Sequence, residues 1–523
     1  MSVSARLESL LRAGQAHLLR DGLKGLEKES LRLSSQGHIA QTPHPASLGS
    51  ALTHPWITTD YSEALVELIT PPFANPEETL GFLSDIHAFV YRHLEDEVLL
   101  ATSMPIGLSG DGSIPIARYG HSNIGMMKHI YRRGLAYRYG RTMQSIAGVH
   151  FNYSVNEALW PVLQALEGNS SAPRSYIDDA YFGTIRNVHR HGWLLIYLFG
   201  NSPVICKSFF QGREFLASRF TELDKGTLYR PYATSLRMSD IGYRNDNQTS
   251  LDISLNNIDD YIASLEAAIN APYLPYEKIG VKVNGEYRQL NANILQIENE
   301  YYSAIRPKQV THSGEKPTLA LRKRGVRYLE LRVLDLMSFD PAGISLDEIR
   351  FLELFVLFSL LTDSPPLTAS EKADCSRNSL SVACCARGPG FQLFHDGQEV
   401  SLARWAGEIL DQLVPLARIM DEGQPDQPYL ASINKQRPAV DDPEQTPSAR
   451  ILHEMRVNGE TFAEFALRLS RQHAGHWDKR KLTAERSAKF AEEAEHSWHK
   501  QEQIESADHI SFDDFLNNYW NQS

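Results

Sequence analysis

Acidic side chains on short strand-like segments are the residues of this chain best placed to do chemistry. In the segment GLEKESLRL, Glu27 and Glu29 lie two positions apart, so on a strand both side chains point to the same face. At about 4 Å and an effective dielectric near 20, two such charges repel by roughly 4 kcal/mol. An isolated pair is more often a solvated strand face, whereas a buried pair requires compensation.

A second acidic segment, ITTDYSEALVELIT, repeats the pattern. Glu63 and Glu67 share one strand parity, whereas Asp60 has the other and joins them only if a turn intervenes. In the segment VRYLELRVLD, Glu330 and Arg332 share the polar face of a strand whose other face is apolar. An acid and a base therefore lie side by side on a surface that resembles a site.

The segment AGVHFNYSV has the same design, with His150 and Asn152 on its polar face. A lone histidine of this kind is more often a core residue or a support for its neighbours. Several strands that each carry acids opposite an apolar face, without a matching set of bases, nevertheless favour an oxygen-rich metal site. Mg²⁺ and Mn²⁺ prefer such ligands, and the sequence has neither cysteine pairs in zinc spacing nor an HExxH motif.

Basic and aromatic residues are interleaved in three further segments, KHIYRRGLAYRYGRTMQS, RPYATSLRMSDIGY and ENEYYSAIRPK. Each segment is either an ordinary amphipathic surface or the lining of a site for anionic substrates, because arginine binds carboxylates and phosphates bidentately. The sequence has no GxxxxGK[ST] motif, so any ATP must be held without a Walker A loop. The basic and aromatic residues of these segments that could line such a site are Tyr131, Arg132, Arg133, Tyr137, Arg138, Tyr139, Arg141, Tyr232, Arg237, Tyr243, Tyr302, Arg306 and Lys308.

The overall composition narrows the class of protein. Of 523 residues, 64 are acidic and 52 are lysine or arginine, so the formal net charge is −12. This balance argues against a partner that is nucleic acid or an anionic membrane, because both need clustered basic residues. The most apolar stretch, residues 351–361, is too short to span a bilayer. Four cysteines without CxxC spacing, and a start that predicts a surface helix rather than a signal peptide, favour the reducing cytoplasm.

Helices and strands are interspersed irregularly up to about residue 365. The Asn75-Pro pair predicts the start of a helix that continues to residue 98. Ser345 and Glu348 predict a capping box at the start of a central, buried helix. Strands are predicted at residues 25–33, 63–70, 147–155, 295–302 and 326–335. Without a regular βαβ repeat or a Rossmann glycine motif, this order favours an α+β fold around an antiparallel sheet.

From about residue 401 the sequence changes to amphipathic helices and polar loops. Helices are predicted at residues 401–420, 448–472 and 482–503, and the segments PDQPYL and DDPEQTPS between them are predicted as loops. We therefore expect a catalytic region over residues 1–365 and a mostly helical C-terminal region over residues 366–523 that packs on it.

Six segments together carry a family resemblance: GLEKESLRL, LGSALTHPWITTDYSEALVELITPP, QSIAGVHFNYS, PYATSLRMSDIGY, LQIENEYYSAIRPK and YLELRVLD. In this order they closely resemble the proteobacterial glutamate–cysteine ligases over most of residues 20–360. The resemblance implies a curved, mainly antiparallel sheet that forms a cradle surrounded by helices, similar to the catalytic domain of glutamine synthetase. It also implies ATP-dependent ligation of the γ-carboxylate of L-glutamate to the amino group of L-cysteine, the first step of glutathione biosynthesis.

The resemblance implies roles for individual residues as well. Arg332 and Glu330 match catalytic positions, and Arg332 is expected to neutralise the transferring phosphoryl group. Arg132 and His150 match positions at the nucleotide end of the site. Positions that line the amino-acid pockets are matched by Tyr131, Arg237, Tyr243 and Tyr302. The family's ligands for Mg²⁺, with Mn²⁺ as an alternative metal, are matched by Glu27, Glu29, Asp60, Glu67, His150 and Glu330.

Two features of the sequence depart from the family pattern. Tyr61 stands where phenylalanine is expected, and its extra hydroxyl group predicts an altered selectivity for cysteine. The sequence after about residue 365 is divergent. Glu63 lies in the same motif as Asp60 and Glu67, and we expect it to support the site rather than to bind metal.

The expected partners are small molecules: L-glutamate, L-cysteine and ATP as substrates, with glutathione as a feedback inhibitor of a monomeric enzyme. Other interpretations of the residues remain open. One is a ligase of the same fold that joins glutamate to a different amine. Clustered carboxylates and arginines also suit a two-metal hydrolase of phosphate esters, and a protein that only binds metal or nucleotide is a third alternative.

Overall fold

A central antiparallel sheet organises the protein. The computed structural model describes residues 3–242 and 251–522, and within these ranges seven strands join this sheet in the order β11, β12, β5, β1, β3 and β2, with β4 pairing a further part of β1. Their bounds are β1 Leu23–Ser34, β2 Ile57–Thr59, β3 Leu65–Ile69, β4 Glu97–Leu99, β5 Val149–Ser154, β11 Ile305–Lys308 and β12 Tyr328–Leu334. The predicted antiparallel arrangement is therefore confirmed.

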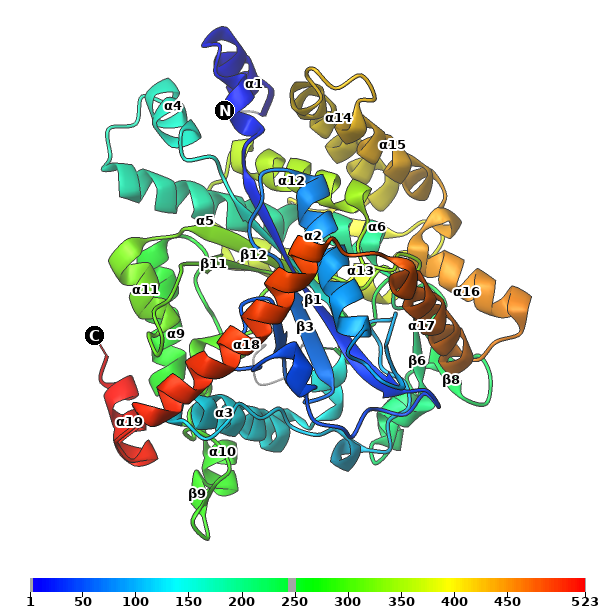
Figure 1. The fold of residues 1–523 in the computed structure, drawn as a ribbon. Helices are drawn as coiled ribbons and strands as arrows, with labels where there is room; N and C mark the ends of the chain where they lie inside the picture. Colours follow the sequence, from blue (N-terminus) through cyan, green and yellow to red (C-terminus); the bar gives the residue numbers. More distant parts are fainter. Residues whose placement is uncertain (1–2, 243–250, 523) are drawn as a thin grey trace.

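Helices surround this sheet on the outside of the molecule (Figure 1). The helices before residue 362 are α1 Val3–Arg12, α2 Pro76–Tyr91, α3 Asn123–Tyr139, α4 Leu159–Leu166, α5 Pro173–His191, α6 Trp193–Phe199, α7 Glu214–Ala217, α9 Ile258–Asn270, α10 Leu274–Ile279, α11 Pro317–Arg324 and α12 Leu346–Leu361. The later helices are α13 Ala369–Cys385, α14 Leu402–Met420, α15 Pro428–Asp441, α16 Pro447–Asn458, α17 Phe462–Lys479, α18 Ala484–Ser506 and α19 Phe512–Trp520. Short strands outside the central sheet are β6 Val204–Cys206, β7 Thr221–Glu222, β8 Thr227–Tyr229, β9 Lys282–Val283, β10 Glu286–Tyr287, β13 Gln392–His395 and β14 Gln398–Ser401.

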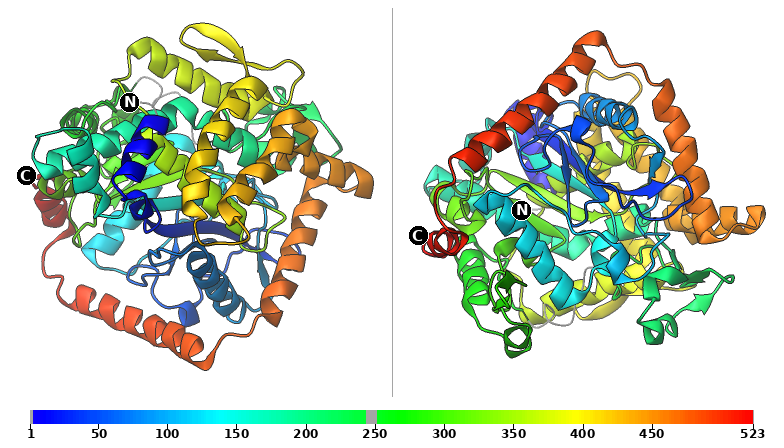
Figure 2. Two further views of the ribbon diagram at one scale, coloured as in Figure 1. Left: turned by 90° about the horizontal axis from the view of Figure 1, so that it is seen from above. Right: turned by 60° about the horizontal axis from the view of Figure 1, so that its bottom comes forward.

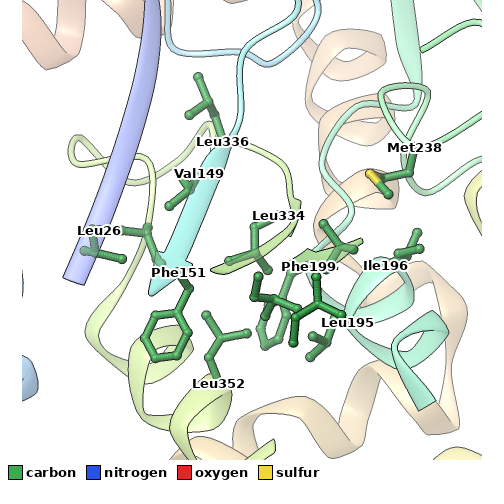
Figure 3. Close-up of a cluster of buried hydrophobic side chains, with 14 of the residues drawn as sticks. Leu26, Val149, Phe151, Leu195, Ile196, Phe199, Met238, Leu334, Leu336 and Leu352 are labelled. Carbon is green, nitrogen blue, oxygen red and sulfur yellow. The ribbon is translucent and has the colours of Figure 1, made fainter. Parts of the chain in front are cut away.

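One face of the central sheet is apolar and packs against helices. Leu26 of β1, Phe151 of β5 and Leu334 of β12 meet Phe199 of α6 and Leu352 of α12 in a buried cluster (Figure 3). Each large apolar side chain buried in this way contributes roughly 1.5–3 kcal/mol to folding. Because strand side chains alternate between faces, this packing leaves the opposite face of the same strands for polar groups.

The central helix α12 confirms the predicted capping box and the predicted burial. The side chain of Ser345 accepts a hydrogen bond from the N–H of Glu348, and the Glu348 carboxylate accepts one from the N–H of Ser345. In the middle of α12, the buried carboxylate of Glu353 is 2.5 Å from Nζ of Lys24 in β1. It also accepts a hydrogen bond from the hydroxyl of Tyr429 in α15, at 2.7 Å. This contact joins the sheet, its central helix and the C-terminal region.

Helix α2 starts as predicted but ends earlier. The Asn75 side chain accepts hydrogen bonds from the N–H groups of Glu77 and Glu78, which confirms the predicted cap. The helix stops at Tyr91, whereas the sequence predicted a continuation to residue 98. The reason is the pairing of Glu97–Leu99 with β1, which lets the Glu97 carboxylate accept a 2.6 Å hydrogen bond from the guanidinium of Arg32.

The predicted strand at residues 295–302 is wrong, because this segment contains a short 3₁₀ turn at Glu298–Glu300 and the strand follows at Ile305–Lys308. The buried carboxylate of Glu300 accepts hydrogen bonds from the N–H of Gln296, the Arg138 side chain and the Tyr139 hydroxyl. Because the Glu300 side chain occupies a nearby backbone N–H, that group is not available for pairing with another strand.

The C-terminal region is helical as expected, but the single helix predicted at residues 448–472 is wrong, because α16 ends at Asn458 with Gly459 in the left-handed conformation and α17 begins at Phe462. The loops of this region also differ from the prediction. The predicted loop at residues 425–430 is partly wrong, because α15 begins at Pro428. Proline is favoured in a first helical turn, and the Asp421 carboxylate accepts hydrogen bonds from the N–H groups of Tyr429 and Leu430 there.

Figure 2 shows α17 and α18 running along the outside of the molecule. Within the described ranges, no helix has both the length and the apolar character needed to cross a membrane.

Candidate active site

The polar face of the central sheet carries acidic and basic side chains from several strands. The strand register places Glu27 of β1 opposite His150 of β5, and Glu29 of β1 opposite Glu67 of β3. On the other side of β5, β12 adds Glu330 to the same face. Residues that are far apart in the sequence are therefore neighbours across the sheet.

A group with balanced charge lies where β1, β5 and β12 meet. Glu27, His150 and Glu330 each offer a potential ligand atom within 4.8 Å of the others. The Glu330 carboxylate lies 3.3 Å from Nζ of Lys308 and 3.2 Å from Nη1 of Arg332. Burial alone raises the pKa of Glu330, but the charges of Lys308 and Arg332 outweigh it and hold the pKa well below its usual range. We call these five residues the balanced group.

Hydrogen bonds also fix Glu27 in its ionised form. Its Oε2 is 3.1 Å from Nδ1 of His150, and its Oε1 accepts a 2.9 Å hydrogen bond from the side chain of Asn152. Burial raises the pKa of Glu27, but the hydrogen bond with His150 reverses the effect, and the pKa is lowered. Both acids of the balanced group are therefore charged at neutral pH.

A second group of acids, Glu29, Glu67 and Asp60, is only partly compensated, because the charge of Arg332 lowers the pKa of Glu29 and Glu67 without outweighing the effects that raise it. We call it the unbalanced group. Glu29 and Glu67 share His150 as a third potential ligand within 4.8 Å. Burial, and then the charge of Asp60, raise the pKa of Glu29 to about 8. Burial and the charge of Glu27 raise the pKa of Glu67 well above its usual range. Among the described residues, no lysine or arginine forms an ion pair with the three carboxylates of this group.

A turn brings Asp60 next to the other acids. β2 ends at Thr59, β3 begins at Leu65, and the N–H of Asp60 donates a hydrogen bond to the carbonyl of Leu65 across the turn. The turn that the sequence required for Asp60 to join Glu67 is thus present. The guanidinium of Arg132 in α3 donates to the carbonyl of Asp60, so this helix holds the turn in place.

A cavity of about 110 Å³ opens beside the unbalanced group. Its wall combines acids from β1 and the turn, arginines from α3 and β12, and aromatic rings from α3 and the segment before β11. Arginine suits a carboxylate and acids suit an ammonium group, so this lining fits a free amino acid. The lining includes Glu29, Asp60, Tyr61, Tyr131, Tyr302 and Arg332.

Most of the residues singled out from the sequence come together here. Arg132 also lines the cavity. Arg237 is buried behind the cavity, where its Nη2 donates a 3.0 Å hydrogen bond to the carbonyl of Arg332. Glu63 accepts hydrogen bonds from two backbone N–H groups of neighbouring loops, which suits a supporting position. Tyr243 lies outside the described residues.

Comparison with known proteins identifies the family. The family model described as "Glutamate-cysteine ligase" matches residues 7–382 of this chain. The chain belongs to the glutamate–cysteine ligase family. It is 50% identical over 519 residues to the glutamate–cysteine ligase of Azotobacter vinelandii, covering 99% of this chain and 97% of the relative. It is 49% identical over 517 residues to that of Pseudomonas aeruginosa, with the same coverage.

Solved structures confirm the fold of this glutamate–cysteine ligase family member. The crystal structure of glutamate–cysteine ligase from Francisella tularensis in complex with AMP has a TM-score of 0.89 and 37% identity, and the match covers 96% of this chain and 97% of that one. A bifunctional glutathione synthetase from Pasteurella multocida matches at a TM-score of 0.68 and 25% identity, over 90% of this chain and 53% of that one. Family membership confirms the predicted activity, ATP-dependent ligation of glutamate to cysteine in the first step of glutathione biosynthesis.

The residues of this ligase fit a divalent metal ion. The donors are carboxylate oxygens and one imidazole, a set that suits Mg²⁺ or Mn²⁺ better than a soft metal. Burial and the repulsion from neighbouring acids raise the pKa of Glu29 and Glu67, and a bound cation would offset both effects. Next to Glu27, the buried side-chain oxygen of Asn152 has no hydrogen-bond partner among the described residues. A bound cation would therefore favour both the repelled carboxylates and the unpartnered oxygen of Asn152.

Sequence analysis named Arg306 and Lys308 as basic residues that could line a site, but it did not pair them with Glu330. Arg306 lies opposite Glu330 in the register, and Lys308 pairs with the Glu330 carboxylate. The alternation of Arg306 and Lys308 is the signal that was available. Their parity was not used because the strand was placed at residues 295–302, and parity is informative only when the strand is located correctly.

Proposed function

We propose that the polar face of the sheet is the active site for this ligation, and that the reaction passes through γ-glutamyl phosphate. The observation that carries the proposal is that a balanced and an unbalanced group of acids share His150 beside a single cavity suited to an amino acid. In the first step, the γ-carboxylate of glutamate attacks the γ-phosphorus of ATP and ADP leaves. In the second step, the amino group of cysteine attacks the acyl carbon and phosphate leaves.

Both reactants of the first step are anions, so the site must reduce their repulsion. We assign the metal ligands to both groups: Glu27, Glu29, Asp60, Glu67, His150 and Glu330. Bound Mg²⁺, or Mn²⁺ in its place, would screen the phosphate charges and polarise the phosphoryl group. The complex of the Francisella tularensis relative with AMP supports an adenine-nucleotide site on the same fold.

Fixed cations act on the transferring phosphoryl group. We assign this role to Arg332, whose guanidinium is held 3.2 Å from the Glu330 carboxylate, with Lys308 beside the same carboxylate. Because these cations are already oriented, they stabilise the charge that develops on the phosphoryl oxygens without having to reorganise. Arg132 and His150 are the residues that we assign to the nucleotide end.

The cavity receives the amino-acid substrates in this proposal. Tyr131 and Tyr302 shape its wall, Arg237 holds the backbone of Arg332, and Tyr243 completes the set predicted from the sequence. The cysteine ammonium group must lose a proton before it attacks, and a carboxylate or phosphate oxygen is the acceptor. A narrow cavity also keeps water away from the acyl phosphate, which water would hydrolyse.

We further propose a cytoplasmic, monomeric enzyme that glutathione inhibits. The cysteines of the described chain are unpaired, which supports a reducing compartment. Residues 1–365 supply the described lining of the cavity and both acid groups, and this supports the division into a catalytic region and a C-terminal region over residues 366–523.

A purified enzyme assay tests the proposal. With ATP, Mg²⁺ and glutamate, phosphate release should match the formation of γ-glutamylcysteine and should require cysteine. Hydroxylamine in place of cysteine should trap the acyl phosphate as a hydroxamate. Phosphate release from a phosphoester without any amine would instead favour the hydrolase, and binding of ATP without turnover would favour a binding protein. Faster turnover with another amine would favour a ligase with a different acceptor.

A further inference from the structure

The helix α19 packs against the back of the cavity wall. Its apolar side chains recur at helical spacing along one side. Together with side chains of α3 and the following segments they form a hydrophobic cluster that is separate from the main core. Figure 1 shows α19 at the end of α18, beside α3. The cluster contains Met127, Ile130, Leu290, Leu516 and Tyr519, with Phe512, Phe515 and Trp520 packed around them.

The residues beneath α19 belong to two walls of the cavity. On α3, Met127 and Ile130 pack in the α19 cluster, while Tyr131 packs against both this cluster and the main core and also lines the cavity. In a second wall, formed by the segment before β11, Ile297 packs on the cluster and Tyr302, five residues later, lines the cavity. The helix therefore supports both walls from behind without contributing to the lining.

Buried polar contacts join the two walls to each other. Arg138 of α3 forms an ion pair with Glu300 at 2.9 Å, and both side chains are almost fully buried. The hydroxyl of Tyr139 donates a 2.7 Å hydrogen bond to the same carboxylate. The side chain of Gln296 donates to the carbonyl of Tyr131 at 3.2 Å. Because the walls are linked in this way, a displacement of one displaces the other.

Polar contacts also hold α19 in place near each of its ends. Nζ of Lys316 donates a 2.8 Å hydrogen bond to the carbonyl of Trp520, and the N–H of Lys316 donates to the side chain of Gln522 at 3.0 Å. In the loop before α19, the Asp508 carboxylate accepts hydrogen bonds from the backbone and the side chain of Asn123, the first residue of α3. Helix α19 is thus fastened to the elements that it covers.

We propose that α19 is a positioning element for the amino-acid cavity, acting through Leu516 and Tyr519 on Tyr131 and on the wall that carries Tyr302. This inference rests on the proposed function of the cavity. Protein interiors are close-packed, so a gap opened under α19 is transmitted to the side chains on the other side of the wall. Apart from Asp60, the acids lie on strands of the central sheet, whereas α19 packs on the side of α3 that carries Met127 and Ile130, which does not include Arg132, the residue that holds the Asp60 turn. The effect therefore falls on binding of the amino acids rather than on phosphoryl transfer.

Substitution of Leu516 in the full-length chain tests the proposal. Leu516→Ala should raise KM for glutamate or cysteine by about five-fold or more, while kcat and KM for ATP stay within about two-fold of wild type. Leu516→Met, which keeps the volume, should restore the wild-type KM. The matched control is Leu452→Ala in α16, where an equally buried leucine lies outside the α19 cluster and the cavity lining. It should lower the melting temperature comparably and leave every KM unchanged.

The outcomes separate this inference from the proposed function. If Leu516→Ala does not fold, Phe515→Ala at a half-buried position of the same cluster takes its place. Unchanged KM values for both amino acids in a folded variant would overturn the positioning role, as would an equal rise of KM in Leu452→Ala. Absence of ligation by the wild-type chain would overturn the proposed function instead.

Discussion

The balanced group around Glu330 and the unbalanced group of Glu29, Glu67 and Asp60 lie on one face of one sheet and share His150, but the protein treats their charges differently. Cations from β11 and β12 meet the carboxylate of Glu330 and lower its pKa. Within residues 3–242 and 251–522, the second group has no lysine or arginine at ion-pair distance, and the pKa of Glu29 rises to about 8. The acids of the first group have basic partners within the chain before any metal ion binds, whereas the described part of the chain offers the acids of the second group no lysine or arginine at ion-pair distance.

This difference corresponds to two requirements of phosphoryl transfer, namely fixed cations that stabilise the phosphoryl group and acids that can bind a metal ion. The effective cost of burying an ion without a partner is several kcal/mol, so a cluster of unpaired acids is costly unless a cation binds it. Fixed cations, by contrast, remain in place during every reaction cycle. In the proposed site, an anionic substrate would meet the permanent positive charge of Arg332 and Lys308 beside the first group, and charge supplied by a bound metal ion beside the second.

The largest effect on ligation is expected from substitution of Arg332 or of its counter-charge, Glu330. Arg332→Ala and Glu330→Gln should each lower ligation by about 10³-fold or more, because loss of an arginine at a transferring phosphoryl group has effects of this size. Phosphate release coupled to γ-glutamylcysteine formation measures the loss, and far-UV circular dichroism should show an intact fold. Near wild-type turnover in either purified variant would contradict the site assignment.

In the absence of metal, substitutions in the two groups should change the free energy of unfolding in opposite directions. Glu330→Gln leaves Lys308 and Arg332 without their counter-charge, and we expect it to lower the free energy of unfolding by about 3 kcal/mol. Glu67→Gln removes a repelled acid, so the metal-free variant should be as stable as wild type or more stable. Urea unfolding in EDTA gives both values. Equal destabilisation of the two variants would remove the distinction between the groups.

Metal addition should sharpen the same comparison. Mg²⁺ at about 100 times its dissociation constant should stabilise the wild-type protein by roughly 2.7 kcal/mol, as for any ligand of the native state alone. The increment should shrink in Glu29→Gln and Glu67→Gln. Thermal unfolding with and without Mg²⁺ measures it, and Ca²⁺-free buffer with added KCl controls for ionic strength. An undiminished increment in both variants would place the metal elsewhere.

The smallest effect concerns the cavity beside the unbalanced group. The hydroxyl of Tyr61 is buried there without a hydrogen-bond partner among the described residues. A hydrogen bond contributes about 1 kcal/mol net, so Tyr61→Phe should change the preference between cysteine and 2-aminobutyrate by about five-fold or less. Competition between the two acceptors measures the ratio. An identical ratio in both proteins would show that the hydroxyl does not contact the acceptor.

Much of the geometry of the candidate site could be predicted because strand parity is visible in a single sequence. The shared face of Glu27 and Glu29, and the turn that Asp60 needs, follow from spacing alone. The balancing role of Lys308 could not be predicted, because it depends on the register between β11 and β12 and the strand was placed too early. The support that α19 gives to α3 depends on packing between distant segments, which amphipathic spacing does not specify.

The contact of Lys24, Glu353 and Tyr429 has a consequence for how the chain is made. Lys24 lies in the same strand as Glu27 and Glu29, whereas Tyr429 comes from α15, so the first strand of the site is anchored by a helix that leaves the ribosome much later. Contacts of such long sequence separation slow folding, since a large loop must close before they form. We therefore expect the nascent catalytic region to remain incompletely ordered, and inactive, until α15 has been synthesised and has docked.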